Sequence, residues 1–283
     1  MISPLSIGTP SSAAAAERVS ILLLGPPGAG KTTQMRTLDP ASTLVLDCEG
    51  GLSAVRGWGG RVVKIRDFRH ARALVGLIGG PDDSREPTEA FSRSFYEAVV
   101  EENGGTFEDL FPGVRTVVFD SLTELSRLAF RWARQQPFAL SEKTGKPDLR
   151  GAYGGLAVAL LDFSRHLQHS PYTTIQIALL ERRTDDAGRQ FWEIQIEGSK
   201  TGRELPGIVD NVMTLLPITD QAGRSRRALV CQPGNPWDVP AKDRSGLLAQ
   251  VEAPNLGALL DRLLAGGAVP ELDLELPVFN LGS

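Results

Sequence analysis

The chain has 283 residues, a formal net charge of −4 and a pI of about 5.5, with 41% hydrophobic and 23% charged residues. This composition is that of a globular protein, and the acidic balance excludes a basic protein that wraps nucleic acid. Cys48 and Cys231 lie far apart without a CxxC partner, which excludes a cysteine-based zinc site and favours a reducing compartment. No apolar run reaches membrane-spanning length and no secretory signal is evident, so we expect a cytoplasmic protein.

Three regions are expected along the chain. Residues 1–17 are rich in Ser, Pro and Ala and predict a flexible arm, residues 18–266 predict a single core, and residues 267–283 form an acidic-hydrophobic tail that either docks on a partner or folds back. Apolar runs predict strands over 19–24, 43–47, 61–65, 114–119, 173–179, 191–196, 212–216 and 228–231. Helical spacing predicts helices over 68–78, 88–102, 121–135, 152–167 and 255–264. The alternation predicts an α/β fold with a mostly parallel central sheet, helices on both faces and an antiparallel hairpin extension.

A phosphate-binding loop is predicted directly after the first strand. The residues Gly25, Pro26, Pro27, Gly28, Ala29, Gly30, Lys31 and Thr32 match G-x-x-x-x-G-K-[ST], and Thr33 follows them. Strand before and helix after, beginning near Gly30, are the context that the motif requires, so we expect residues 25–33 to hold ATP. Lys31 is predicted to reach the β- and γ-phosphates and Thr32 to bind Mg²⁺. The alternative is a glycine-rich turn without a ligand.

Two acidic residues are candidates to complete this site. Asp120 ends a buried apolar strand, where it would hold Mg²⁺ through water, although Asp120 or Ser121 could instead cap the next helix. Glu49 follows the strand at 43–47, at the sheet edge where ligands sit, and could polarise a water for attack on the γ-phosphate. The alternative for Glu49 is a solvated loop acid. AAA+ machines usually place a Glu directly after the Asp, and Ser121 departs from that pattern.

In these two acidic segments the chain resembles the RecA-like ATPases, in which a hydrophobic-Asp-x-Glu segment carries the catalytic Glu and the second acidic motif reads Asp-Ser. Residues 241–246, AKDRSG, also resemble the Lys-x-Arg-x-Gly element of RecA-like hexameric helicases and RadA-type proteins. The resemblance implies that Lys242 and Arg244 touch the γ-phosphate of a neighbouring subunit. Two residues apart, both point the same way in an extended segment. The alternative is a solvated basic turn.

The order of GPPGAGKTT, LDCEGG, VVFDSLTEL, YGGL and AKDRSG is most similar to compact phage ATPases with a RecA-like core, several of which are implicated in single-strand annealing and recombination. This resemblance implies a homo-oligomer (ring or filament), an ATPase stimulated by single-stranded DNA, a partner such as a single-strand-binding protein, and the cytoplasm of a bacterial host. Glu181 stands where the family usually has a phosphate-sensing Gln. Sensing is therefore either lost or performed by Arg182, Arg183 or Lys200.

Two segments, residues 134–151 and 182–203, are candidate DNA-binding loops by this resemblance. The charge balance around them differs: residues 121–150 carry six basic against three acidic residues, whereas residues 181–204 carry five basic against six acidic ones. The candidate cations are Arg134, Lys143, Lys146, Arg150, Arg182, Arg183, Lys200 and Arg203. Phe191 and Trp192 could stack on bases, but packing within a hairpin is the alternative.

Two other functions fit parts of the pattern. GPPGAGKTTQ also resembles the loops of adenylate-kinase-like small-molecule kinases, which would predict a monomer with an Arg-rich lid. A nucleotide-dependent assembly switch with little hydrolysis and no DNA is the third possibility.

Overall fold

The computed structural model describes residues 17–141, 143–219 and 223–266. Its strands are β1 Ser20–Gly25, β2 Thr43–Asp47, β3 Arg61–Lys64, β4 Thr116–Asp120, β5 Thr173–Thr184, β6 Gln190–Ile194, β7 Asn211–Thr219, β8 Ser225–Val230, β9 Lys242–Asp243 and β10 Val251–Glu252. Its helices are α1 Phe68–Gly79, α2 Arg93–Asn103, α3 Phe107–Leu110, α4 Leu122–Ala133, α5 Leu149–Gln168, α6 Ser199–Ile208 and α7 Leu256–Ala265. Short 3₁₀ helices are η1 Thr32–Thr37, η2 Leu52–Val55 and η3 Pro137–Ala139. The predicted tail over 267–283, and the arm except for residue 17, lie outside the described residues.

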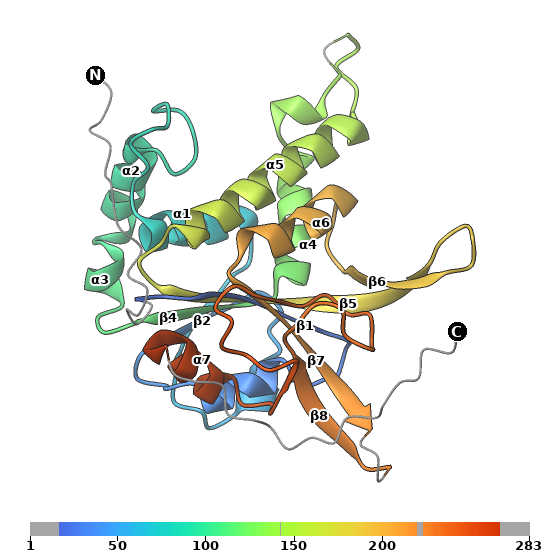
Figure 1. Cartoon of the computed structure of the whole chain (residues 1–283). Helices are drawn as coiled ribbons and strands as arrows, with labels where there is room; N and C mark the ends of the chain where they lie inside the picture. Colours follow the sequence, from blue (N-terminus) through green and yellow to red (C-terminus); the bar gives the residue numbers. More distant parts are fainter. Residues whose placement is uncertain (1–16, 142, 220–222, 267–283) are drawn as a thin grey trace.

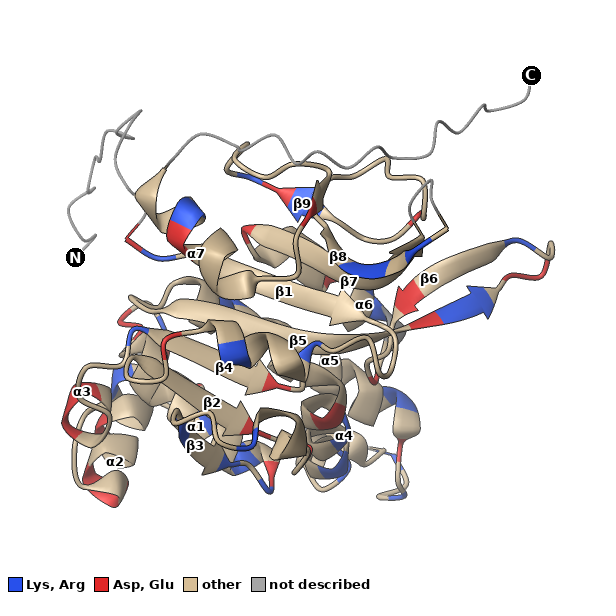
Figure 2. Ribbon diagram, turned by 90° about the horizontal axis from the view of Figure 1, so that it is seen from below, with Lys and Arg blue, Asp and Glu red and all other residues tan. Residues whose placement is uncertain are grey.

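A single sheet organises the described residues. Its strand order is β10-β8-β7-β1-β5-β4-β2-β3, with β6 paired to β5 and β9 paired to β7 (Figure 2). The six strands from β7 to β3 are parallel to their neighbours along this order, whereas β6, β8, β9 and β10 pair antiparallel. The predicted α/β fold, with a mostly parallel central sheet and an antiparallel extension, is confirmed by this strand order.

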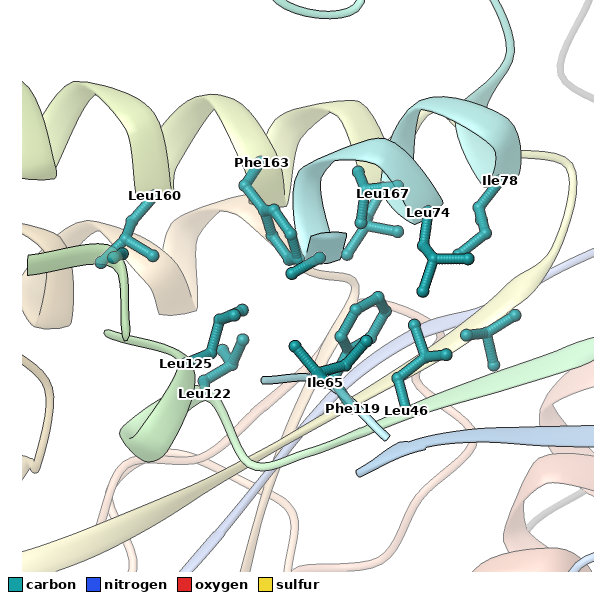
Figure 3. Packing of buried hydrophobic residues seen from close by; sticks show 14 of the residues in the cluster. Leu46, Ile65, Leu74, Ile78, Phe119, Leu122, Leu125, Leu160, Phe163 and Leu167 are labelled. Atoms are coloured by element: carbon teal, nitrogen blue, oxygen red, sulfur yellow. The ribbon is translucent and has the colours of Figure 1, made fainter. Parts of the chain in front are cut away.

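Two apolar layers cover the two faces of the sheet. Helices α1 to α6 lie on one face, and α7 lies with η1 and η2 on the other (Figure 1). Strand β1 is buried along its whole length, as expected for a parallel strand covered on both faces. On the α1 side, Phe119 of β4 packs under Phe163 of α5 and near Leu46 of β2, in a core built from several elements (Figure 3).

The strand register brings three chain segments to one edge. Gly25 at the end of β1 is level with Leu179, and Asp47 at the end of β2 is level with Asp120 at the end of β4. Carboxyl ends of parallel strands are where ligands bind in open α/β sheets. This edge therefore gathers the predicted phosphate loop and both predicted acidic segments.

Two predictions about secondary structure are wrong. The segment after the phosphate loop is the six-residue 3₁₀ helix η1 rather than a helix from near Gly30, and it ends where Leu38 becomes extended, two residues before Pro40. Helix α6 was not predicted, and it occupies part of the second candidate DNA loop. No helix among the described residues is long and apolar enough to cross a membrane.

Candidate active site

The phosphate loop takes the turn that its glycines allow. Gly28 and Gly30 adopt φ values of 74° and 101°, a region that residues with a Cβ rarely enter. A Cβ on Gly25 would lie 2.6 Å from the carbonyl oxygen of Leu215, so the start of the loop can pack against β7 only without a side chain. Because η1 is short, the loop's own amide groups and Lys31, rather than a long helix, must supply most of the positive potential.

Lys31 lies buried inside the loop, with 7% of its surface exposed. Its Nζ donates to the carbonyl oxygens of Gly25 at 2.9 Å and Pro26 at 3.0 Å. Burial lowers the pKa of this ammonium to about 8, and the charges of Asp120 and Glu49 offset part of the effect. The ammonium is therefore held at the loop centre by two main-chain carbonyl oxygens.

Thr32 and Asp120 form the second contact of the site. The Thr32 hydroxyl donates to Asp120 Oδ2 at 2.9 Å, which joins the loop to the end of β4. The pKa of Asp120 is raised to about 6, chiefly by burial, with Glu49 and Asp47 adding to the shift and the Thr32 hydrogen bond opposing it. Burial disfavours the charged form of the Asp120 carboxyl group, and a divalent cation bound to it and to the Thr32 hydroxyl would stabilise that charge.

These oxygen donors fit magnesium. Oxygen ligands suit Mg²⁺, which keeps several waters and takes few protein ligands when phosphates are present. The described residues contain no group of three or more His, Cys, Asp or Glu that could hold a metal by themselves. Thr32 and Asp120 are thus suited to Mg²⁺ that arrives with a nucleotide.

Glu49 lies at the same edge and is held there from two sides. Asp47 Oδ1 accepts from the amides of Glu49 at 3.2 Å and Gly50 at 2.7 Å, which fixes the turn after β2. The Ser121 hydroxyl donates to Glu49 Oε1. Because Ser121 follows Asp120, this hydrogen bond ties the exposed Glu49 to the end of β4. The helix-capping alternative also holds, since Ser121 Oγ accepts from the Glu124 amide at 3.4 Å.

Residues 17–245 match the model of a protein family described as an AAA domain. The chain belongs to the AAA-domain family. It is accordingly a P-loop ATPase domain that binds ATP.

Solved structures and curated sequences add little to this assignment. The chain is similar to the ATPase domain of G40P, with 13% identity and a TM-score of 0.34 over 81% of this chain and 78% of that one. It is also similar to a prototypical ATPase from the type III secretion system of pathogenic bacteria, with 20% identity and a TM-score of 0.34. That second similarity covers 70% of this chain and about half, 51%, of the other. No curated protein sequence matches the chain.

Arg227 of β8 is a site residue that sequence reasoning missed. Its Nη2 donates to the carbonyl oxygen of Gly28 at 3.4 Å, across almost 200 residues of sequence. A Cβ on Gly30 would lie 2.9 Å from Arg227 Nη1, so the guanidinium rests against the bare backbone of the ATPase loop. No motif surrounds Arg227; only the antiparallel pairing of β8 with β7 brings it here.

Lys242 and Arg244 lie near the amino ends of the parallel strands, opposite to the carboxyl ends that carry the phosphate loop. Strand β9 pairs with Asn211 and Val212 at the start of β7, and Asn211 is level with Ile21 at the start of β1. The phosphate loop begins at the other end of β1. The strand β9 is thus separated from its own chain's phosphate loop by three to four residues of β1, about 10 to 13 Å at 3.3 Å per residue.

Both side chains contact the end of α6 in their own chain. Lys242 Nζ donates to three carbonyl oxygens, those of Pro206 (2.9 Å), Gly207 (3.3 Å) and Val209 (2.7 Å). Arg244 donates to Gly207 O at 3.1 Å and pairs with Asp210 at 3.2 Å, and its side chain is 51% exposed. They point the same way, as their spacing predicts. Burial and the neighbouring Arg244 lower the pKa of Lys242. Their role towards a neighbouring subunit stays a prediction.

The first candidate DNA segment presents exposed cations. Arg134 ends α4, Lys143 and Lys146 lie in the turn before α5, and Arg150 lies in the first turn of α5. This part projects beyond the sheet in Figure 1. Within the described residues, none of these four side chains has a carboxylate partner within 4 Å.

The second candidate segment is not a loop. Residues 182–194 belong to the β5–β6 hairpin, on which acidic and basic residues alternate in Figure 2, and Lys200 and Arg203 lie in α6. Arg183 pairs with Glu181 and Glu193, and Lys200 pairs with Glu204 at 3.8 Å. Arg182 lies 4.9 Å from the centre of the Trp192 ring, and Trp192 donates to Trp237 O. The packing alternative is therefore the better description of Trp192.

Proposed function

We propose that this AAA-domain chain is an oligomeric, Mg²⁺-dependent ATPase that acts on single-stranded DNA in recombination or strand annealing, in the cytoplasm. The observation that carries the proposal is the convergence of Lys31, Thr32, Asp120 and Glu49 at one sheet edge, joined by the Thr32–Asp120 and Ser121–Glu49 hydrogen bonds. Both described cysteines are free, which fits a reducing compartment.

Each residue of this edge has a role that its contacts support. The loop amides and Lys31 bind and orient the triphosphate, and Thr32 and Asp120 would hold Mg²⁺. The bound metal would supply charge neutralisation of the phosphate oxygens. Ser121 orients the Glu49 carboxyl group, which accepts this hydrogen bond and would take a proton from an attacking water.

The proposed DNA contact is assigned to the first segment. Its cations Arg134, Lys143, Lys146 and Arg150 are exposed and have no ion pair with a described carboxylate, whereas Arg183 and Lys200 are paired. Free cations release counterions from phosphates on binding, and paired ones must first lose their carboxylate. We assign Lys242 and Arg244 to a neighbouring subunit's phosphates, which requires them to leave α6.

Phosphate release from ATP, measured without any acceptor, tests the enzymatic part and separates it from a small-molecule kinase. The wild-type protein should release phosphate in Mg²⁺, and Lys31→Ala should not. Sedimentation with ATP, Mg²⁺ and single-stranded DNA tests oligomerisation, and a titration of DNA across salt concentrations tests phosphate contacts. Turnover without any DNA affinity would leave an assembly ATPase. Tight ATP binding without turnover would leave a nucleotide-dependent switch.

A further inference from the structure

Arg227 lies at the phosphate loop because of strand alternation in β8. Side chains two residues apart share a sheet face, so Arg227 shares a face with Leu229 and Cys231, which pack in the same core as Ala29 of the loop. Arg226 shares the opposite face with Ala228 and Val230, which pack in a separate cluster. The sheet therefore aims one of two adjacent arginines at the loop and the other away from it.

The register explains how far Arg227 reaches. Arg227 is level with Pro217 of β7, three residues beyond Thr214, which is level with Leu24 near the end of β1. Strands β7 and β8 thus continue past the end of β1 and run beside the phosphate loop, which follows β1. Arg227 is placed next to the loop segment from Gly28 to Gly30 by rigid sheet rather than by a flexible connection.

The contacts of Arg227 leave its guanidinium available for a ligand. To the residues that the structure describes it makes one hydrogen bond, from Nη2 to Gly28 O, and that bond is long at 3.4 Å. Its side chain has no carboxylate within 4 Å among the residues the structure describes, and the residue is exposed. A guanidinium carries five N–H donors in a planar fork that matches phosphate oxygens, so most of its donors are unused here.

We infer that Arg227 binds a phosphate oxygen of the nucleotide held by the phosphate loop of its own chain. The inference rests on the proposed nucleotide site and adds a cation to it that no motif predicts. Gly28 and Gly30 are part of the predicted phosphate-binding motif, so a guanidinium that rests on both lies at the loop where the proposed nucleotide binds. Arg244, at the other edge of the sheet, cannot perform this role within the same chain.

The test compares Arg227→Ala with Arg226→Ala, the matched control on the opposite face of the same strand. Equilibrium binding is measured with two probes in Mg²⁺, ATP and inorganic tripolyphosphate. A charge-assisted hydrogen bond to phosphate predicts that Arg227→Ala weakens both probes by about 10- to 100-fold. Arg227→Lys should lose less, because it keeps a point charge without the fork, and Arg226→Ala should match wild type.

Each outcome decides one point. Equal affinities for wild type and Arg227→Ala overturn the inference. Weaker ATP binding with unchanged tripolyphosphate binding also overturns it, because the guanidinium then acts on the base. If the wild-type protein binds neither probe, the proposed nucleotide site itself is wrong.

A mixing experiment tests the assignment to the same chain. When Glu49→Gln and Arg227→Ala proteins are mixed, every copy lacks one of the two groups, so ATP turnover should not exceed that of the diluted Arg227→Ala protein. Recovered turnover would show that Arg227 serves a neighbouring copy and would overturn the assignment.

Discussion

The two edges of the sheet each hold a lysine and an arginine that donate to main-chain carbonyl oxygens. At the carboxyl end of β1, Lys31 and Arg227 contact the loop itself, beside Asp120 and Glu49. Near the amino end of β1, Lys242 and Arg244 contact the last turn of α6. The first set of acceptors belongs to the phosphate loop, whereas the second set consists of carbonyl oxygens at the C-terminal end of α6.

This difference shows why a basic motif alone does not establish a phosphate site. Carbonyl groups at a helix end need donors, and Lys242 satisfies three of them within its own chain. Lys31 donates to two carbonyl oxygens of the phosphate loop itself, so it already lies where the proposed ligand binds. Lys242, in contrast, must give up three hydrogen bonds to the end of α6 before it can contact a phosphate.

The largest expected effect is at Lys31. Lys31→Ala should reduce ATP hydrolysis to background, because the loop loses the cation buried at its centre. Steady-state phosphate release, with circular dichroism to confirm folding, measures it. Glu49→Gln is the paired variant and should bind ATP but not turn it over, so loss of ATP binding in Glu49→Gln would contradict its assignment as a base.

Arg244→Ala sharpens the comparison from the other edge. If Arg244 serves a neighbouring subunit, turnover should fall by about 1,000-fold, the lower range for an arginine finger. A mixture of Glu49→Gln and Arg244→Ala should then recover activity, because some interfaces combine an intact Glu49 with an intact Arg244. A mixture as inactive as its components would limit Arg244 to its contact with α6.

The stability of the protein itself is expected to depend on pH, because of the buried His166. Activities of the variants at the two ends of the sheet should therefore be compared at a pH where the fold is fully stable. His166 is 6% exposed, and its Nε2 has no hydrogen-bond partner among the described residues. Burial, with Arg85 nearby, lowers its pKa to about 4 against the opposing charges of Asp82 and Asp162. A depressed histidine pKa means that the unfolded chain binds the extra proton, so stability is lost as pH falls below about 6.5. We expect a loss of about 2 kcal/mol between pH 7 and pH 5.

Urea denaturation at both pH values measures this loss, with His166→Gln as the comparison. The variant should be less pH-dependent than wild type by about that amount, whatever its absolute stability. The same pH slope in both proteins would show that His166 does not cause the loss.

The smallest expected effect is at Lys242. Lys242→Met keeps most of the stem but leaves three carbonyl oxygens of the α6 end without their donor, so the free energy of unfolding should fall by about 1 kcal/mol. Lys64→Met, at an exposed lysine of β3 without an ion pair among the described residues, is the control and should change little. Equal stability of the two variants would remove the structural role proposed for Lys242.

The parts of the fold that follow local chemistry were predictable from the sequence. Buried parallel strands read as apolar runs, so β1, β2 and β4 were found together with the loop and the two acids that follow them. Helix α6 was missed because Gly202 and Pro206 interrupt any helical pattern within it. Arg227 was missed because only the sheet brings it to a loop almost 200 residues away.

The C-terminal helix is mechanically attached to the segment that follows the phosphate loop. The Leu256 amide donates to Gln34 Oε1 at 3.2 Å, and the Gly257 amide donates to Thr37 Oγ1 at 2.9 Å. A Cβ at Gly257 would lie 1.9 Å from Thr37 O, so the two backbones touch. Any shift of η1 must therefore either move α7 with it or break both hydrogen bonds. A spectroscopic probe attached to α7 would consequently report displacement of the segment that follows the phosphate loop.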